Sequence, residues 1–166
     1  MRRSALSLGL VLAGCGRLGF DTTTQAATDA APPDVATCTA MYSAFPEGCF
    51  RLSVVGATAA AAEAACELDG GHLAVITSIA ENATLTTFQG VNTTWIGVAD
   101  VGAGFVSVTT GAPPSFTRWA PGDPNGEGAC VRLLGGGNGT WDDEPCSRVQ
   151  RYLCEIDGDA AVVAVP

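Results

Sequence analysis

The sequence predicts an α+β domain. Two helix-forming segments alternate with short strands in the first half of the folded part, and short β-branched and aromatic runs separated by glycine and proline follow in the second half. Seven cysteines in 166 residues indicate an oxidising compartment, where disulfides brace small domains. We therefore expect one disulfide-braced domain with two helices followed by short antiparallel strands.

Composition and charge limit the class of ligand. Hydrophobic residues make up 47% of the chain and charged residues 15%, which is enough apolar material for one packed core. The formal net charge is -9, and all 8 basic residues are arginine. Nucleic acids and anionic lipid surfaces need basic patches, so this balance argues against both. A cation or a neutral polyol fits the chain better.

The first 14 residues are typical of a lipoprotein signal peptide. A positively charged start precedes the apolar run Ala5–Ala13, which is too short to span a bilayer. Leu12–Cys15 resembles the bacterial lipobox, which implies cleavage before Cys15 and lipidation of that cysteine. Gly16, where an aspartate would favour the inner membrane, favours the outer membrane of the cell envelope. An ordinary secretory signal, in which Cys15 is discarded, is the alternative.

Residues 15–37 are expected to form a flexible tether. Threonine, alanine, aspartate and proline dominate this segment, and large apolar residues are almost absent, so burial cannot offset the entropy of ordering it. The folded domain is expected over 38–156, and residues 157–166 are expected to be a loose tail.

Local signals mark the elements in the first half of the domain. Cys38 and Cys49 bracket a short segment that contains proline and glycine. The first helix is rich in alanine and ends at Asp69–Gly71, whereas Ser78 and Glu81 have the spacing of a capping box at the start of the second. The expected elements are a strand over 49–55, a helix over 58–68, a strand over 72–76 and a helix from 78 to about 88.

Aromatic and β-branched residues mark the strands of the second half. These expected strands are Trp95–Val98, Ser115–Trp119, Thr140–Trp141 and Gln150–Cys154. The three tryptophans could serve as platforms for sugar stacking, but large aromatics in short strands more often fill the core. We expect them to be core residues.

Two oxygen-rich groups stand near the second and third tryptophans. Asp123-Pro124-Asn125 follows Trp119, and Asp142-Asp143-Glu144 follows Trp141. Carboxylate and amide oxygens are ligands of hard cations, and a cysteine after each group could hold its backbone in place. The sequence therefore predicts an oxygen-lined cation site. A solvated acidic turn at 142–144 is the alternative, because charged runs are usually solvated.

Four features, in this order and with this cysteine frame, resemble a C-type lectin domain. They are Trp95-Ile-Gly-Val98, Trp119 followed by Asp123-Pro-Asn125, Trp141-Asp-Asp143, and cysteines at 66, 130, 146 and 154. The resemblance covers Cys38 to about Ile156. It implies a C-type lectin-like α+β fold with two helices, small antiparallel sheets and a long ligand-binding loop region.

The resemblance also selects a disulfide pairing. Six cysteines outside the leader allow 15 pairings by counting alone. The family pattern implies Cys66 with Cys154, Cys130 with Cys146, and Cys38 with Cys49.

Sugar-binding members of the family hold Ca²⁺ around a cis proline, and most of that ligand pattern occurs here. The matching residues are Asp123, Asn125, Glu127, Asp142 and Asp143. By the same resemblance, a calcium ion with two open positions would accept vicinal hydroxyls of a sugar, and Asp123, Asn125, Glu127 and Asp142 would hydrogen-bond those hydroxyls.

The chain departs from the family pattern at several of these positions. Asp123 is one methylene shorter than the usual Glu or Gln, and Glu127 stands one residue further from the following cysteine than usual. Asp142 replaces an asparagine. At the accessory calcium site Asp100 matches, but Gly104 stands where an acid is expected. We therefore expect one calcium at most and no readable sugar preference.

These observations predict a calcium-dependent carbohydrate-binding domain on a lipid-anchored protein of the bacterial cell envelope. The expected partner is a carbohydrate or glycoconjugate, nucleic acid is not expected, and the membrane is reached through the lipid anchor only. A calcium-independent module that binds a protein ligand on the same scaffold is the alternative, because a fold does not fix a function.

No enzymatic activity is expected. The sequence shows no Ser-His-Asp or Cys-His arrangement, and the sole histidine, His72, lies in an expected strand far from the acidic groups. A structural role for His72 is therefore favoured over a catalytic or metal-binding one. Sequence alone leaves open glycoside hydrolysis by paired carboxylates.

Overall fold

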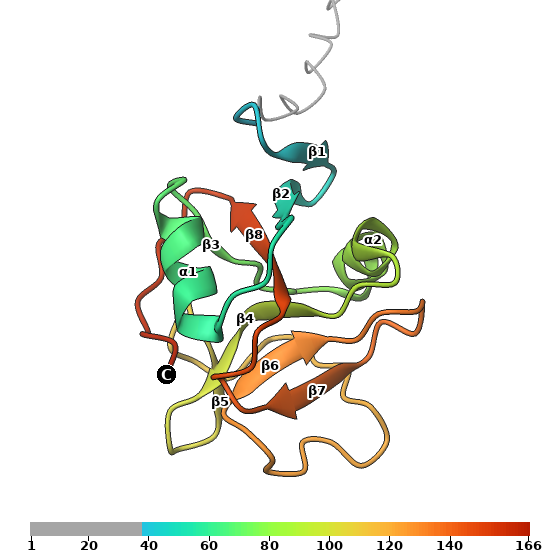
Figure 1. The fold of residues 1–166 in the computed structure, drawn as a ribbon, viewed down its shortest axis with the longest axis vertical. Coiled ribbons are helices and arrows are strands. Elements are labelled where there is room, and N and C mark those ends of the chain that lie inside the picture. Colours follow the sequence, from blue (N-terminus) through green and yellow to red (C-terminus); the bar gives the residue numbers. More distant parts are fainter. Residues whose placement is uncertain (1–37) are drawn as a thin grey trace, which may run out of the picture. The chain divides into compact units, whose positions relative to one another are not determined.

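The computed structural model describes residues 38–166, so the expected signal peptide, the lipidated Cys15 and the tether lie outside the described part. The elements of the domain are shown in Figure 1. They are β1 (Ser43–Phe45), β2 (Gly48–Leu52), α1 (Ala59–Glu67), β3 (His72–Leu73), α2 (Ile79–Gln89), β4 (Thr94–Asp100), β5 (Phe105–Ser107), β6 (Cys130–Leu133), β7 (Trp141–Glu144) and β8 (Arg151–Ile156). Two helices and short, mostly antiparallel strands make up the α+β arrangement that the sequence predicts. Over 38–166, no helix is both long and apolar enough to cross a bilayer.

The strands form one branched sheet. Its order is β1-β2-β8-β4-β6-β7, with β3 added to β8 and β5 added to β4. The β4–β8 pair is parallel, and the other pairs are antiparallel. Strand β8, the last strand of the domain, therefore lies beside β2, near the start of the domain (Figure 1).

Both helices begin where the sequence predicts, and the capping box expected at Ser78 and Glu81 is formed. The Thr58 side chain accepts a hydrogen bond from the Ala61 N–H, and the Ser78 hydroxyl accepts one from the Glu81 N–H at 3.1 Å. Glu81 completes the second cap, because its Oε2 accepts hydrogen bonds from the N–H and the hydroxyl of Thr77, both at 2.8 Å. Side chains thus satisfy backbone donors that have no partner inside the helix.

Two strand expectations differ from the structure. β3 covers only two of the five residues expected over 72–76, and Trp119 makes a single bridge to Trp141 instead of ending a strand. Strand β6 was not expected from its own residues. It is defined by its partners β4 and β7, and a four-residue strand between glycine-rich loops carries little local signal.

The tryptophans fill the core. Trp95 and Trp141 are fully buried, and Trp119 packs edge-on against Trp141 with ring centroids 5.9 Å apart. The ring N–H groups of Trp95 and Trp141 are also satisfied. Trp95 donates to the Ala57 carbonyl at 3.0 Å, and Trp141 donates to Asn82 Oδ1 at 2.8 Å. Burying a large aromatic ring with its N–H paired adds apolar contact without an unsatisfied donor.

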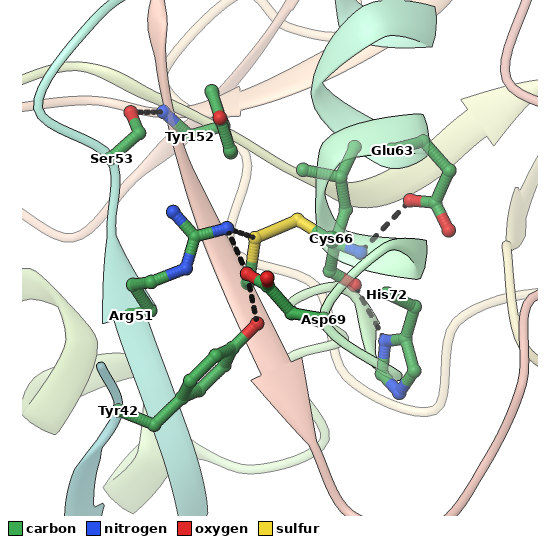
Figure 2. Close-up of a disulfide and its surroundings, with 10 residues drawn as sticks. Tyr42, Arg51, Ser53, Glu63, Cys66, Asp69, His72 and Tyr152 are labelled. Carbon is green, nitrogen blue, oxygen red and sulfur yellow. Dashed lines mark hydrogen bonds and ion pairs between the residues drawn. A yellow bond between two sulfur atoms is a disulfide. The ribbon is translucent and has the colours of Figure 1, made fainter. Parts of the chain in front are cut away.

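Three disulfides tie the domain together, and they join the pairs that the family resemblance implies. They are Cys38–Cys49, Cys66–Cys154 and Cys130–Cys146. Figure 2 shows the bond from Cys66 in α1, and Arg51, whose Nη2 atom contacts both the partner sulfur at 3.1 Å and Asp69 Oδ2 at 2.7 Å. This bond closes a loop of 88 residues, which is worth about 4.5 kcal/mol in the chain-entropy model.

The C-terminal segment 157–166 has no helix or strand, but it is docked instead of loose. The N–H groups of Val162 and Val163 both donate to the Val108 carbonyl, at 2.8 and 3.0 Å. Asp157 pairs with the buried His72, and Val165 packs against the core. The segment therefore belongs to the folded domain.

Candidate functional site

Three aspartates converge at one edge of the domain. Asp142 and Asp143 belong to β7, and Asp123 belongs to the long loop between β5 and β6. One carboxylate oxygen from each lies within 4.8 Å of the others. The acidic residues near the second and third tryptophans thus form one cluster, although about twenty positions separate them along the chain.

Asp143 holds the loop in place. Its side chain is fully buried, and its carboxylate accepts hydrogen bonds from the N–H groups of Asn125 at 2.7 Å, Gly126 at 2.9 Å and Gly128 at 3.2 Å. A buried carboxylate is costly unless such donors surround it. The loop also runs very close to β7, since a Cβ atom at Gly128 would lie 1.8 Å from the Glu144 carbonyl carbon.

Asp123 and Asn125 stand side by side on this loop. The peptide bond between Asp123 and Pro124 is cis, as the resemblance implies, and Asn125 Nδ2 donates to Asp123 Oδ1 at 2.9 Å. Partial burial and the nearby charges of Asp142 and Asp143 raise the pKa of Asp123. Asp123 therefore holds its proton more tightly than a free aspartate does.

Glu127 does not join the cluster. Its side chain is exposed, and its carboxylate is not among the oxygens that converge. Its backbone N–H donates to Asn125 Oδ1 at 2.9 Å, which tightens the loop instead. The position of Glu127, one residue further from Cys130 than in the family pattern, is consistent with this placement.

Arg132 faces the cluster from the neighbouring strand. It is the direct partner of Asp142 in the β6–β7 ladder, and both its Nε and its Nη2 donate to Asp142 Oδ2, at 2.9 and 2.6 Å. The same Nη2 is 2.6 Å from Glu144 Oε2. Arg132 cannot be recognised from the sequence, because only the strand register brings it opposite Asp142.

The donor set fits a hard cation. The three converging groups offer only oxygen, which is what calcium requires. Among residues 38–166, neither Asp123 Oδ2 nor Asp142 Oδ1 has a hydrogen-bond partner, so both can face an ion. Arg132 and the backbone donors to Asp143 already neutralise part of the negative charge.

The accessory position forms a closed turn. Asp100 Oδ1 accepts hydrogen bonds from the N–H groups of Gly102 and Gly104, at 2.8 and 3.0 Å. Asp100 belongs to neither of the metal-type clusters found in the described part of the chain.

The second such cluster surrounds the sole histidine. His72 is fully buried, and its ring lies with the carboxylates of Glu155 and Asp157, each offering one ligand atom within 4.8 Å of the others. From the sequence, a structural role for His72 is favoured, because the residue lies far from the acids of the calcium motif. A signal for the cluster is the pair Glu155 and Asp157, two residues apart at and just beyond the end of β8.

Comparison with known proteins gives a family match and a similar relative. Residues 55–156 match the family model described as the lectin C-type domain. The chain is 33% identical over 134 residues to C-type lectin domain family 10 member A of Rattus norvegicus, covering 74% of this chain and 42% of that protein. The chain thus spans about two fifths of that relative's length.

Solved structures share the fold. The human scavenger receptor C-type lectin carbohydrate-recognition domain aligns with a TM-score of 0.65 and 26% identity, covering 72% of this chain and 98% of that one. A calcium-independent type II antifreeze protein aligns with a TM-score of 0.64 and 28% identity, covering 76% of this chain and 95% of that one.

Proposed function

Because this chain belongs to the C-type lectin domain family, we propose that it binds carbohydrate through a calcium ion at the aspartate cluster. One observation carries the proposal: oxygens of Asp123, Asp142 and Asp143 lie within 4.8 Å of one another beside the cis Asp123–Pro124 bond. Likeness to a carbohydrate-recognition domain supports the choice of ligand class.

The proposed ligands are Asp123, Asn125, Asp142 and Asp143. A calcium ion there would supply open coordination positions for two vicinal hydroxyls of a sugar. Asp123 and Asn125 lie on the exposed side of the cluster, so their remaining oxygens and amide hydrogens would orient those hydroxyls. Glu127 would contribute only after a movement of the loop, because its carboxylate lies outside the cluster.

Titration calorimetry tests this function. The full chain is titrated with Ca²⁺ and then, with Ca²⁺ present or chelated, with a panel of simple hexoses and N-acetylhexosamines. We expect one equivalent of calcium, and sugar binding only when calcium is present. Asp123→Asn is expected to weaken both, because it removes a charge that has no structural partner except Asn125.

Asp100→Asn is the matched control, since Asp100 is a half-buried aspartate at the end of β4, outside the cluster. It is expected to leave calcium binding unchanged. Absence of calcium heat from the full chain, or equal binding by the Asp123→Asn variant, would contradict the calcium step.

A second candidate is a calcium-independent binding module. The Arg132 guanidinium already forms an ion pair with Asp142, so it partly replaces the positive charge that calcium would bring. Likeness to a calcium-independent antifreeze protein shows that this fold also occurs without the metal requirement. A ligand that stays bound when calcium is chelated would favour this candidate, and a protein ligand is then the class to test.

For the leader we propose a lipid anchor on Cys15 in a bacterial cell envelope. The lipobox-like Leu12–Cys15 and the following Gly16 support it. Mass spectrometry of the protein made in a bacterial host with its leader would show cleavage before Cys15 and an acylated cysteine. A Cys15→Ala variant is expected to stay uncleaved, and an unmodified Cys15 in the mature chain would overturn the proposal.

A further inference from the structure

The second metal-type cluster is built by strand register. His72 in β3 and Glu155 in β8 are direct partners across an antiparallel ladder. Side chains at such positions lie on the same face of a sheet, and residues two apart in a strand share that face. Asp157, two residues after Glu155, therefore comes to the same place just beyond the end of β8. The fold itself assembles these three groups.

The ring of His72 is oriented like that of a metal ligand. Its Nδ1 is 2.8 Å from the Leu73 carbonyl oxygen, so Nδ1 carries the proton that it donates there (Figure 2). A backbone carbonyl that accepts from one ring nitrogen is the usual partner of a histidine that binds a metal through the other. In the neutral ring Nε2 then has a lone pair, and this atom points away from Leu73 towards Asp157.

Two acceptors face each other at this point. Nε2 of His72 is 3.0 Å from Asp157 Oδ1, and neither atom brings a hydrogen of its own when the ring is neutral. Either a proton or a metal ion must lie between them. The 3.0 Å separation is close to the roughly 3.3 Å between ligand atoms of a tetrahedral site with bonds of about 2.0 Å.

Glu155 supplies a third, incompletely satisfied ligand. It is 4% exposed, and its Oε2 accepts from the Val75 N–H at 2.9 Å, while no residue in 38–166 donates to its Oε1. It borders a cavity of about 550 Å³ whose lining contains carboxylates but no lysine or arginine. The lining carboxylates are those of Glu47, Glu81, Glu155, Asp157 and Asp159.

Glu47, which also lines this cavity, has an unsatisfied carboxylate oxygen. Its Oε2 is a buried atom without a hydrogen-bond partner in the described residues. Buried unpaired carboxylate oxygens are rare, because each loses its hydration without compensation. A positive ion in or beside the cavity would restore the balance of charge.

We propose that His72, Glu155 and Asp157 form a binding site for one divalent transition-metal ion of the zinc class, separate from the aspartate cluster. Imidazole nitrogen and carboxylate oxygen are both ligands of this class, and three protein ligands leave the fourth position to water from the cavity. Calcium and magnesium prefer sites made only of oxygen, so the imidazole selects against them.

The sole histidine makes a direct test possible. The untagged full chain, labelled with ¹⁵N and freed of metal by a chelator, is titrated with Zn²⁺ while the imidazole nitrogens are followed by NMR. We expect the Nε2 resonance to shift to the position of a metal-bound nitrogen at one equivalent, with Nδ1 still protonated. An unchanged imidazole spectrum would overturn the proposal, because it would leave only a proton between His72 and Asp157.

Calorimetry with variants gives an independent measurement. Zn²⁺ binding is expected to be at least about tenfold weaker in Asp157→Asn and absent in His72→Gln. Asp123→Asn, at the other cluster, serves as the matched control and is expected to bind zinc normally. If Asp123→Asn loses zinc binding while Asp157→Asn and His72→Gln keep it, the ion lies at the aspartate cluster and the proposal is overturned.

Two further outcomes are distinguished by the same experiment. Asp157 is about one third exposed, so its replacement does not disturb the core. The Asp157→Asn variant therefore remains informative even if His72→Gln fails to fold, which circular dichroism would reveal.

Excess Ca²⁺ is expected to leave zinc bound. Displacement of zinc by calcium would show a site made of the carboxylates alone and would overturn the role of His72. Loss of calcium-dependent sugar binding would not affect any of these results.

Discussion

Arg132 lies directly opposite Asp142 in the β6–β7 ladder, and its Nη2 atom is 2.6 Å from Asp142 Oδ2. The same atom reaches Glu144 at 2.6 Å, so one guanidinium serves two carboxylates at the edge of the calcium candidate site. An internal cation thus competes with a metal ion for the same negative charge. The strength of calcium binding should therefore depend on a residue that is not a ligand.

Replacing Arg132 by glutamine is expected to raise calcium affinity. The change removes one positive charge next to Asp142 and frees its Oδ2, and we expect an increase of about threefold to tenfold, or roughly 0.7 to 1.4 kcal/mol. Calorimetry at constant ionic strength measures it, and the increase should shrink as salt is added.

Arg148→Gln is the matched control for this prediction. Arg148 pairs with Glu144 at 2.6 Å but has an exposed side chain and no contact with Asp142. It is expected to change calcium affinity little. If Arg132→Gln lowers the affinity, then Arg132 positions Asp142 for the ion and does not compete with it.

The sequence predicts most of the framework because its signals are local. The first helix follows from its alanine-rich sequence, and the start of the second follows from the capping side chain of Ser78. The burial of Trp95 and Trp141 follows from large aromatics in short strands. The family resemblance adds the disulfide pairs and brings together aspartates that lie far apart in the chain.

The remaining features depend on register, which local signals do not carry. Arg132 meets Asp142, and His72 meets Glu155, only because of how particular strands pair. A motif position can also mislead: Glu127 matches a position of the family pattern, but its carboxylate lies outside the cluster. A shift of one residue turns a side chain to the other face, and no composition rule detects that.

Asp143→Asn is expected to destabilise the domain more than Asp123→Asn does. The Asp143 carboxylate accepts three backbone N–H groups with two oxygens, and an asparagine offers only one. We expect a loss of about 1–3 kcal/mol in the free energy of unfolding, measured by urea denaturation with calcium chelated. Equal stability of both variants would show that the loop does not depend on Asp143.

Gly128→Ala is expected to displace the site loop from β7. The added Cβ would lie 1.8 Å from the Glu144 carbonyl carbon, and a backbone atom cannot rotate away as a side chain can. We expect a loss of at least about 2 kcal/mol in stability, together with weaker calcium binding. Gly102→Ala is the control for backbone conformation alone, because Gly102 has φ +93° but open space around it, and it is expected to cost about 1–2 kcal/mol without affecting calcium.

Glu63 is expected to make the domain more stable in mild acid than at neutral pH. Burial raises the pKa of this carboxyl above its ordinary value, although a hydrogen bond from the Leu73 N–H, 2.9 Å from Glu63 Oε2, partly opposes the shift. The folded state then holds the proton more tightly than the unfolded state does. Its contribution to stability is therefore largest near or below the unfolded value of 4.5 and is lost as the pH rises through the folded pKa.

The variant Glu63→Gln isolates this contribution. Glutamine can still accept from Leu73 through its single oxygen, and its amide nitrogen replaces Oε1, which has no hydrogen-bond partner in the described chain. With metals chelated, urea denaturation between pH 4.5 and neutral pH should show a smaller fall in stability for Glu63→Gln than for the parent chain. Glu67→Gln, on the same helix but exposed, removes only the smallest of the contributions that raise the pKa of Glu63, so it should keep most of the parent's pH dependence. Parallel curves for the parent and Glu63→Gln would mean that Glu63 keeps the same proton affinity in the folded and unfolded states.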